Sequence, residues 1–249
     1  MSNKEHKILK ALVLLAKRGP VEAIGSGPNA VGKTLQEYLG ISHSTTSRNT
    51  FHGYTVTATK SLSNSSGRTN LFACVPSWDI SNKKSSKEIL LSFGRDDLDR
   101  GYAKSLFCTT TSLGPNGFGL TLKVDASNKS LEEWHVSGQC DDMVVAWDVS
   151  RLEAKLANLG DVAIITALPI DTGEKLSFQF RHVDLLSQPN IDGFLDLLDS
   201  GIITIDHCLS MKVGTEVARE QGPLFKITAN ARDELYGEVK RYDLLDLRL

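Results

Sequence analysis

The chain has 249 residues, of which 41% are hydrophobic and 23% are charged, so it can bury a core as one large α/β domain or two small ones. Its formal net charge of -2 neither indicates nor excludes a nucleic-acid partner, because a local basic cleft is enough to attract a polyanion. The sequence contains no CxxC pair that would indicate zinc, no apolar signal-peptide core and no apolar run of about 20 residues, so we expect a cytoplasmic protein without a membrane partner.

The first 60 residues predict two helices and one strand. Apolar residues at helical spacing over 4–18 predict a helix that Gly19-Pro20 ends. A second helix is predicted at about 33–39, and a polar loop at 42–49 follows it. The alternation of polar and apolar residues over 54–60 then predicts a strand.

The remainder of the chain predicts strands and helices in mixed order. Ser/Asn/Gly-rich residues 61–70 predict a loop, and Ser150 is the expected cap of a helix over 151–158. Further elements are predicted as strands at 71–75, 104–112, 118–124, 143–147, 162–167, 202–205 and 224–227, and as a helix at 191–199. This mixed order favours an α/β fold with a mixed sheet. Since no internal repeat or long linker divides the chain, we expect residues 1–249 to form a single domain.

Residues 27–34 read Gly-Pro-Asn-Ala-Val-Gly-Lys-Thr and match the phosphate-loop pattern GxxxxGK[ST] in full. In a nucleotide-hydrolysing protein the backbone of such a loop cradles phosphates, while its lysine and threonine reach the outer phosphates and magnesium. The motif requires a buried strand before the loop, and residues 21–24, Val-Glu-Ala-Ile, make a poor one. Asp148 and Asp206 are candidates for the acid of such a site, although their flanks favour other roles. A P-loop NTPase stays an alternative.

A second pattern begins in the same residues and extends further along the chain. Residues 31–40 read VGKTLQEYLG, and residues 50–57 read TFHGYTVT. Together they resemble the MvaI/BcnI family of type II restriction endonucleases, whose members read GxGKTxExxL on a helix and DFHx[IYV]E[IL]K on a strand. That family is itself similar to the MutH mismatch-repair nicking enzyme. The resemblance continues through residues 69–72, 191–207 and 222–227 and so spans most of the chain.

The resemblance implies a PD-(D/E)xK fold, an α/β fold with a mixed β-sheet flanked by helices. It implies one restriction-endonuclease-like domain over 1–249 with a DNA-binding cleft, a catalytic-type half at about 1–125 and a C-terminal DNA-recognition segment at about 190–230. Members of the family cut duplex DNA with magnesium that carboxylates hold, beside a lysine on the same strand face.

All four catalytic positions that the resemblance carries over are changed in this sequence. The family's helix glutamate falls on Gln36, its aspartate on Thr50, its strand glutamate on Thr55 and its lysine on Thr57. A threonine hydroxyl is a neutral and weak ligand for a hard dication, and threonine is also an ordinary strand residue. We therefore expect no functional catalytic residue, no metal and no magnesium cofactor.

Two nearby charges do not restore the set. Glu37 lies one position along the helix from Gln36, about 100° around its axis. Lys60 lies an odd number of residues from Thr55 and Thr57, so on a regular strand it points to the opposite face. The residues at these positions therefore do not support the usual metal-dependent nuclease activity.

Side chains that suit phosphate contacts remain near the expected cleft. These candidates are Lys33, Arg48, Lys60, Arg68 and Asn70. The alternative for each single lysine is that it is only a solvated surface charge. His52 belongs to the family's DFH pattern, as either a packed or a functional residue.

The family's base-reading segment HxHG corresponds here to Arg219-Glu220-Gln221-Gly222. Arginine pairs with guanine and glutamine with adenine in the major groove, so Arg219 and Gln221 are candidate base contacts. Lys226, in the strand that follows, completes the expected DNA contacts.

We therefore expect a monomer on DNA that binds duplexes sequence-selectively and no longer cleaves them with magnesium. One alternative is an active type II restriction endonuclease whose site is rebuilt from other residues, and another is the P-loop NTPase. The target sequence does not carry over from the family.

Overall fold

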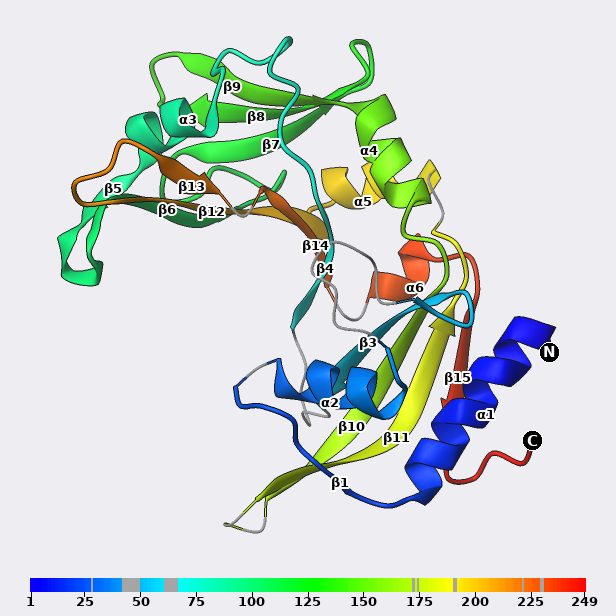
Figure 1. Cartoon of the computed structure of the whole chain (residues 1–249). Helices are drawn as coiled ribbons and strands as arrows, with labels where there is room; N and C mark the ends of the chain where they lie inside the picture. The colour runs from blue at the N-terminus through cyan, green and yellow to red at the C-terminus, as the bar shows by residue number, and fades with distance from the viewer. Residues whose placement is uncertain are drawn as a thin grey trace. The chain divides into compact units, whose positions relative to one another are not determined.

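The computed structural model describes residues 1–27, 29–41, 50–60, 67–171, 173, 175–189, 192–220, 222–228 and 231–249. The chain forms two compact units (Figure 1). Unit 1 comprises Met1–Ser65, Leu159–Pro189 and Tyr236–Leu249, and unit 2 comprises Ser66–Asn158 and Asn190–Leu235. The predicted loop at 42–49 and most of the one at 61–70 lie outside the described residues. The single domain with its cleft stays a prediction.

Unit 1 is built on a mixed sheet with the strand order β1-β11-β10-β3-β2, in which β15 also pairs with β11. Strands β3 and β10 run parallel, whereas the other pairs are antiparallel. The elements of unit 1 are α1 (Asn3–Lys17), β1 (Val21–Glu22), α2 (Ala30–Tyr38), β2 (Thr50–Phe51), β3 (Tyr54–Lys60), β10 (Val162–Asp171), β11 (Leu176–Leu186) and β15 (Val239–Asp243). The predicted mixed sheet is confirmed.

Helix α1 begins with a capping box that also fixes the helix to the sheet. The Ser2 hydroxyl accepts a hydrogen bond from the backbone N–H of Glu5, and the Glu5 carboxylate accepts one from the N–H of Ser2, both at 3.2 Å. Glu5 is buried, and it also accepts hydrogen bonds from the Tyr242 hydroxyl at 2.6 Å and from Lys240 Nζ at 3.2 Å. The same carboxylate therefore caps α1 and joins it to β15.

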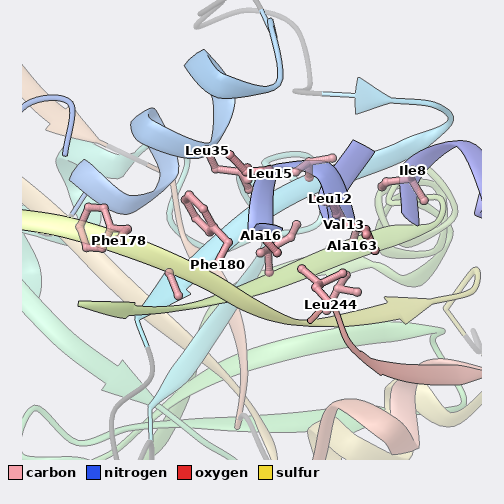
Figure 2. Close-up of a cluster of buried hydrophobic side chains, with 14 of the residues drawn as sticks. Ile8, Leu12, Val13, Leu15, Ala16, Leu35, Ala163, Phe178, Phe180 and Leu244 are labelled. Atoms are coloured by element: carbon pink, nitrogen blue, oxygen red, sulfur yellow. The ribbon is translucent and has the colours of Figure 1, made fainter. Parts of the chain in front are cut away.

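Helices α1 and α2 contribute to one hydrophobic core on a face of the unit 1 sheet. Figure 2 shows the apolar side chains of both helices against β10 and β11. The labelled members are Ile8, Leu12, Val13, Leu15, Ala16, Leu35, Ala163, Phe178, Phe180 and Leu244. Tyr54 and Val56 of β3 belong to the same core, so Thr55 and Thr57 between and after them point to the other face. Each large apolar side chain buried in this way contributes about 1.5–3 kcal/mol.

Unit 2 contains two sheets. The first has the strand order β4-β14-β12-β6-β5, with β13 also paired to β12, and the second has the order β7-β8-β9. The elements of unit 2 are β4 (Arg68–Ala73), α3 (Ser86–Phe93), β5 (Arg95–Asp97), η1 (Leu98–Arg100), β6 (Tyr102–Thr110), β7 (Leu120–Asp125), β8 (Ser130–Val136), β9 (Asp141–Asp148), α4 (Val149–Ala157), α5 (Asp192–Asp199), β12 (Ile203–Lys212), β13 (Ala218–Glu220), β14 (Leu224–Thr228) and α6 (Arg232–Leu235).

Aromatic side chains form the centre of unit 2. Phe225 stacks on Phe72 with 4.9 Å between ring centroids, and Trp147 meets Phe225 edge-on at 5.9 Å. The buried indole of Trp147 donates its N–H to the carbonyl of Cys74 at 2.8 Å, which satisfies the polar atom of that ring. These contacts link β4, β9 and β14.

A buried ion pair connects the two sheets of unit 2. His207 Nε2 of β12 lies 2.9 Å from Glu133 Oε1 of β8, and both side chains are inaccessible to solvent. Burial by itself lowers the pKa of His207, but the adjacent carboxylate of Glu133 outweighs it and raises the pKa above its ordinary value. We therefore treat this pair as a protonated imidazole beside a carboxylate.

Most of the predicted elements are confirmed, and one predicted helix cap is wrong. The predicted strand at 54–60 agrees in full with β3, and the helices predicted at 4–18, 33–39 and 191–199 correspond to α1, α2 and α5. The predicted cap of α4 is wrong, because Asp148 is the N-cap and accepts a hydrogen bond from the N–H of Ser150 at 2.8 Å. Asp148 precedes the first helical residue and can cap the free N–H groups, whereas Ser150 already lies within the helix.

We predict that Glu133→Gln lowers the free energy of unfolding by about 3–5 kcal/mol near pH 6, because it leaves His207 buried without its partner. The raised pKa of His207 means that its stabilisation is fully present below about pH 6.5, the ordinary histidine value, and is lost as the pH rises through the folded value. Urea unfolding should therefore show a difference between wild type and His207→Gln that shrinks as the pH rises from 6.

The exposed His6 offers a matched control, since His6→Gln removes an imidazole from the solvent-facing side of α1. This variant should unfold at nearly the same urea concentration as wild type at pH 6. A stability difference for His207→Gln that grows with rising pH would contradict the protonated pair.

Candidate nucleic-acid interface

The loop that matches the phosphate-loop pattern does not have the structure that the pattern requires. The strand before it, β1, has two residues and pairs antiparallel with β11 at the end of the sheet order. The Thr34 hydroxyl is buried, donates to the carbonyl of Ala30 and accepts from the N–H of Ile24, both at 2.8 Å. It therefore closes the loop onto α2 and is engaged within the chain. The structural basis of the NTPase alternative is missing in this part of the chain.

A tight hairpin positions two of the changed catalytic residues. His52 and Gly53 form the two-residue turn between β2 and β3, and both have positive φ angles, 49° and 84°. Two-residue hairpin turns favour this backbone, which glycine adopts freely and histidine tolerates better than most side chains. The turn places Thr50 directly opposite Thr55. His52 thus has a local structural role as an exposed turn residue.

The two other changed positions meet beside the hairpin. Gln36 of α2 and Thr57 of β3 line one surface cavity of about 240 Å³, together with Asn29 and Lys33. Thr57 follows Thr55 by two residues on the strand, so the two side chains share a face. The structure therefore brings together, within unit 1, the helix and strand positions that the family resemblance singled out.

The side chains at these positions do not fit a magnesium site. Magnesium prefers charged oxygen ligands, whereas the cavity presents amide, hydroxyl, ammonium and apolar groups. Lys33 adds a positive charge where a dication would have to bind. In the ranges that the structure describes, no group of three or more His, Cys, Asp or Glu side chains is placed to hold a metal ion.

Asp161 is an acidic residue whose backbone lies beside this site. Its carbonyl accepts a hydrogen bond from the N–H of Thr55 at 2.8 Å. Its carboxylate, however, pairs with Lys4, whose ammonium lies 4.6 Å from the ring centroid of Tyr54. Because Tyr54 belongs to the buried face of β3, the carboxylate lies on that side and not with the Thr55 hydroxyl. Asp161 therefore does not replace the changed glutamate.

The predicted phosphate contacts of unit 1 differ in their environments. Lys33 is exposed on α2. Lys60 instead lies with its ammonium 5.6 Å from the ring centroid of Phe178, a core residue, which agrees with the expectation that it faces away from Thr55 and Thr57. Arg48 lies outside the described residues.

The predicted DNA contacts of unit 2 share one face of its first sheet. Lys226 of β14 lies opposite Asn70 of β4 and opposite Thr204 of β12. Arg219 of β13 lies opposite Ser210, which is on the same side of β12 as Thr204. Arg219 is exposed, and Gln221 lies outside the described residues. The segment is extended through Glu220, as the base-reading hypothesis for Arg219 requires.

Asp206, which the sequence does not predict as part of a DNA-binding face, lies among these cations. The carboxylate of Asp206 pairs with Arg68 at 2.6 Å and with Lys226 at 2.6 Å, and it accepts a hydrogen bond from the Thr109 hydroxyl at 2.7 Å. Partial burial alone raises the pKa of Asp206, but the hydrogen bonds from Lys226, Thr109 and Arg68 hold it below its ordinary value. In the sequence, the polar residues Thr204 and Asp206 alternate with apolar ones, which indicates a polar strand face. Only the strand register shows which cations they contact.

Comparisons with known proteins agree with this geometry. The sequence model of the MvaI/BcnI restriction endonuclease family matches residues 9–236. The chain belongs to this family. No curated protein matches the chain. Among solved structures, "Restriction endonuclease MvaI-cognate DNA substrate complex" is similar with a TM-score of 0.76 and 17% identity, over 98% of this chain and 99% of that chain.

A second solved structure, "Restriction endonuclease MvaI in the absence of DNA", is similar with a TM-score of 0.57 and 17% identity, over 97% of this chain and 98% of that chain. At this identity the likeness establishes the fold. The expected restriction-endonuclease-like α/β fold of the MvaI/BcnI family is thereby confirmed. No helix in the described portion of the chain is both long and apolar enough to cross a membrane.

We predict that the joint substitution Gln36→Glu, Thr50→Asp, Thr55→Glu and Thr57→Lys makes the protein bind magnesium more tightly than wild type does. The three carboxylates would meet in the geometry described above, and no single substitution should suffice because such groups act as a unit. Isothermal titration calorimetry with magnesium measures the effect.

The matched control is Glu37→Gln in the quadruple variant, because Glu37 is exposed one position away on the same helix. This further change should leave the recovered binding intact. A folded quadruple variant that binds no magnesium would show that the four residues are wrongly aligned with the family's catalytic positions.

We also predict that millimolar ATP leaves the melting temperature of the protein unchanged, because the Thr34 hydroxyl is engaged by Ile24 and Ala30. Thermal denaturation with and without ATP and magnesium tests this. A clear rise that Lys33→Ala abolishes would restore the NTPase alternative.

Proposed function

We propose that the protein binds double-stranded DNA sequence-selectively and does not cleave it with magnesium. The observation that carries this proposal is the uncharged character of the reassembled family site, in which Gln36, Thr50, Thr55 and Thr57 replace three carboxylates and a lysine. Loss of one electrostatic catalytic group commonly costs about 3 kcal/mol in transition-state stabilisation. Loss of the whole set removes the groups that hold the metal and position the attacking water in the family.

Duplex DNA is the proposed partner because of the family and the donors that remain. The solved structure of MvaI named above is a complex with cognate DNA, which supports the same class of partner for this chain. Arg219 and Gln221 are the proposed base contacts, while Lys33 and Arg48 are proposed to contact phosphates and so to position the duplex. Lys60, His52, Asn70 and Lys226 complete the proposed DNA-binding set, together with Arg68, which supports the set through its pair with Asp206.

The finer features of the proposal follow from the same reasoning. We propose a cytoplasmic protein that acts as a monomer on DNA and requires no metal cofactor for binding. A family member of this kind is a pseudoenzyme, and it would act by occupying sites on DNA. The alternative, an active endonuclease with a rebuilt site, requires acidic groups near Thr55, and Asp161 is engaged by Lys4.

We predict that the purified protein shifts duplex DNA in a binding assay but leaves plasmid intact with magnesium or manganese. Binding should weaken steeply with salt, by a slope of about -0.9 in log K against log salt for each neutralised phosphate. Lys33→Ala should lower affinity for all sequences to a similar extent and reduce that slope by about one.

The control for cleavage is a variant with the same purification history and a changed binding face, Arg219→Ala. Nicking that survives further purification and requires a divalent metal would refute the inactive pseudoenzyme and favour a rebuilt site. If nicking is equal in both preparations and disappears on further purification, it belongs to a contaminant.

A further inference from the structure

In the cluster around Asp206, some side chains use all their hydrogen-bonding groups within the protein, whereas others keep donors for DNA. The cluster consists of Asp206, Arg68, Lys226, Thr109 and Thr204, from strands β4, β6, β12 and β14. The side chain of Asp206 is 13% exposed, that of Lys226 21% and that of Arg68 31%. Each group is therefore partly withdrawn from water, and its hydrogen bonds are held in defined directions.

Asp206 has no acceptor capacity left for a DNA base. Its Oδ1 accepts from Arg68 Nη1 at 2.6 Å and from the Thr109 hydroxyl at 2.7 Å. Its Oδ2 accepts from Arg68 Nη2 at 3.2 Å and from Lys226 Nζ at 2.6 Å. A carboxylate offers about four acceptor positions, and these contacts fill them. Asp206 therefore serves its neighbours in the protein.

Arg68 is engaged to a similar degree. Besides the bidentate pair with Asp206, its Nη1 donates to the Thr204 hydroxyl at 2.8 Å and its Nη2 to the Thr109 hydroxyl at 3.1 Å. All of the donors on its two terminal nitrogens are used. A DNA phosphate would have to break this bidentate pair to reach these donors. Arg68 therefore stabilises the cluster from within the protein.

Lys226 is different because it keeps donors. An ammonium has three N–H groups, and in the described part of the chain the contact with Asp206 uses one of them. The carboxylate of Asp206 already fixes the long side chain of Lys226. Less conformational entropy is therefore lost when Lys226 binds a partner. Asp206 shares its negative charge between Lys226 and Arg68, so the ammonium keeps much of its charge while one of its N–H groups fixes its direction. Such a group suits the neutral, acceptor-bearing edge of a base.

We propose that Lys226 reads a guanine in the major groove through its two remaining N–H groups, and that Asp206 is the positioning residue that aims them. Guanine presents two adjacent acceptors there, O6 and N7, and lysine is one of the side chains that contacts both. This inference rests on the proposed DNA binding and adds a recognised base to it. The exposed Asn70, opposite Lys226 in the sheet, lies beside this contact.

The test begins with selection of binding sequences from random duplexes by the wild-type protein. Lys226→Ala should lose the guanine preference at one base pair, by about 5- to 150-fold in relative affinity, while the slope of affinity against salt stays unchanged. Replacing that guanine by 7-deazaguanine removes N7 and should weaken wild type but not Lys226→Ala. Lys226→Arg should keep the guanine preference, because arginine contacts the same two acceptors.

The positioning role of Asp206 has a separate readout. Asp206→Asn should blur the guanine preference and raise affinity for unselected DNA, because it frees Lys226 and removes a negative charge. Circular dichroism establishes whether this variant is folded, and if it is not, the pair Lys226→Ala and Lys226→Arg decides the proposal. Lys104→Ala is the matched control, since Lys104 is another ion-paired lysine of this sheet, 3.1 Å from Asp96. It should leave the selected motif unchanged.

The outcomes separate this inference from the function on which it rests. A wild-type protein that binds no duplex overturns both. If wild type selects a motif and Lys226→Ala selects the same one with a salt slope lower by about one, Lys226 contacts a phosphate and only the base-reading inference fails. If Asp206→Asn keeps both the motif and its strength, Asp206 does not position Lys226.

Discussion

The parallel pairing of β3 with β10 is the constraint on which the rest of the structure depends. Parallel neighbours cannot be joined by a tight turn, so the chain needs a long connection between them, and that connection forms the first part of unit 2. The pair is held by backbone hydrogen bonds such as that from Thr55 N–H to the Asp161 carbonyl. Because the backbone fixes the positions of Thr55 and Thr57, these side chains can change without loss of the scaffold. This explains how the family fold persists where the family's acidic residues do not.

The two units use polar groups in opposite ways. In unit 1, the cavity beside α2 is lined by neutral side chains and Lys33, and it presents no carboxylate to hold a dication. In unit 2, charged side chains are concentrated around Asp206, and their mutual hydrogen bonds set which donors stay available. Charges that are held in fixed directions in this way contribute to selectivity more than to general affinity for a polyanion. A net charge of -2 for the whole chain is compatible with this arrangement, because local geometry decides the contact.

The sequence predicts those features that are encoded locally. β3 was predicted in full because its alternation of threonines with apolar residues has the period of a strand and a turn precedes it. Strand β11 was not predicted, because it has strand partners on both sides and carries charged residues such as Arg181 and Asp184 among its apolar ones. The four changed catalytic positions were located through the family resemblance. The contacts of Asp206 were out of reach, because they depend on the register between strands that are distant in the sequence.

The interleaved connectivity of the units has a consequence for how such proteins diversify. The chain passes from one unit to the other at 65–66, 158–159, 189–190 and 235–236, so neither unit is a continuous stretch of sequence. A single genetic crossover between two family members at a point between β3 and β10 would therefore build unit 1 from two parents, with β3 of one paired to β10 of the other. Exchange of a whole unit, which takes one crossover in proteins whose domains follow one another along the chain, takes several crossovers in this architecture. Point substitution on a fixed framework, or replacement of short surface segments within one unit, leaves such strand pairings unchanged.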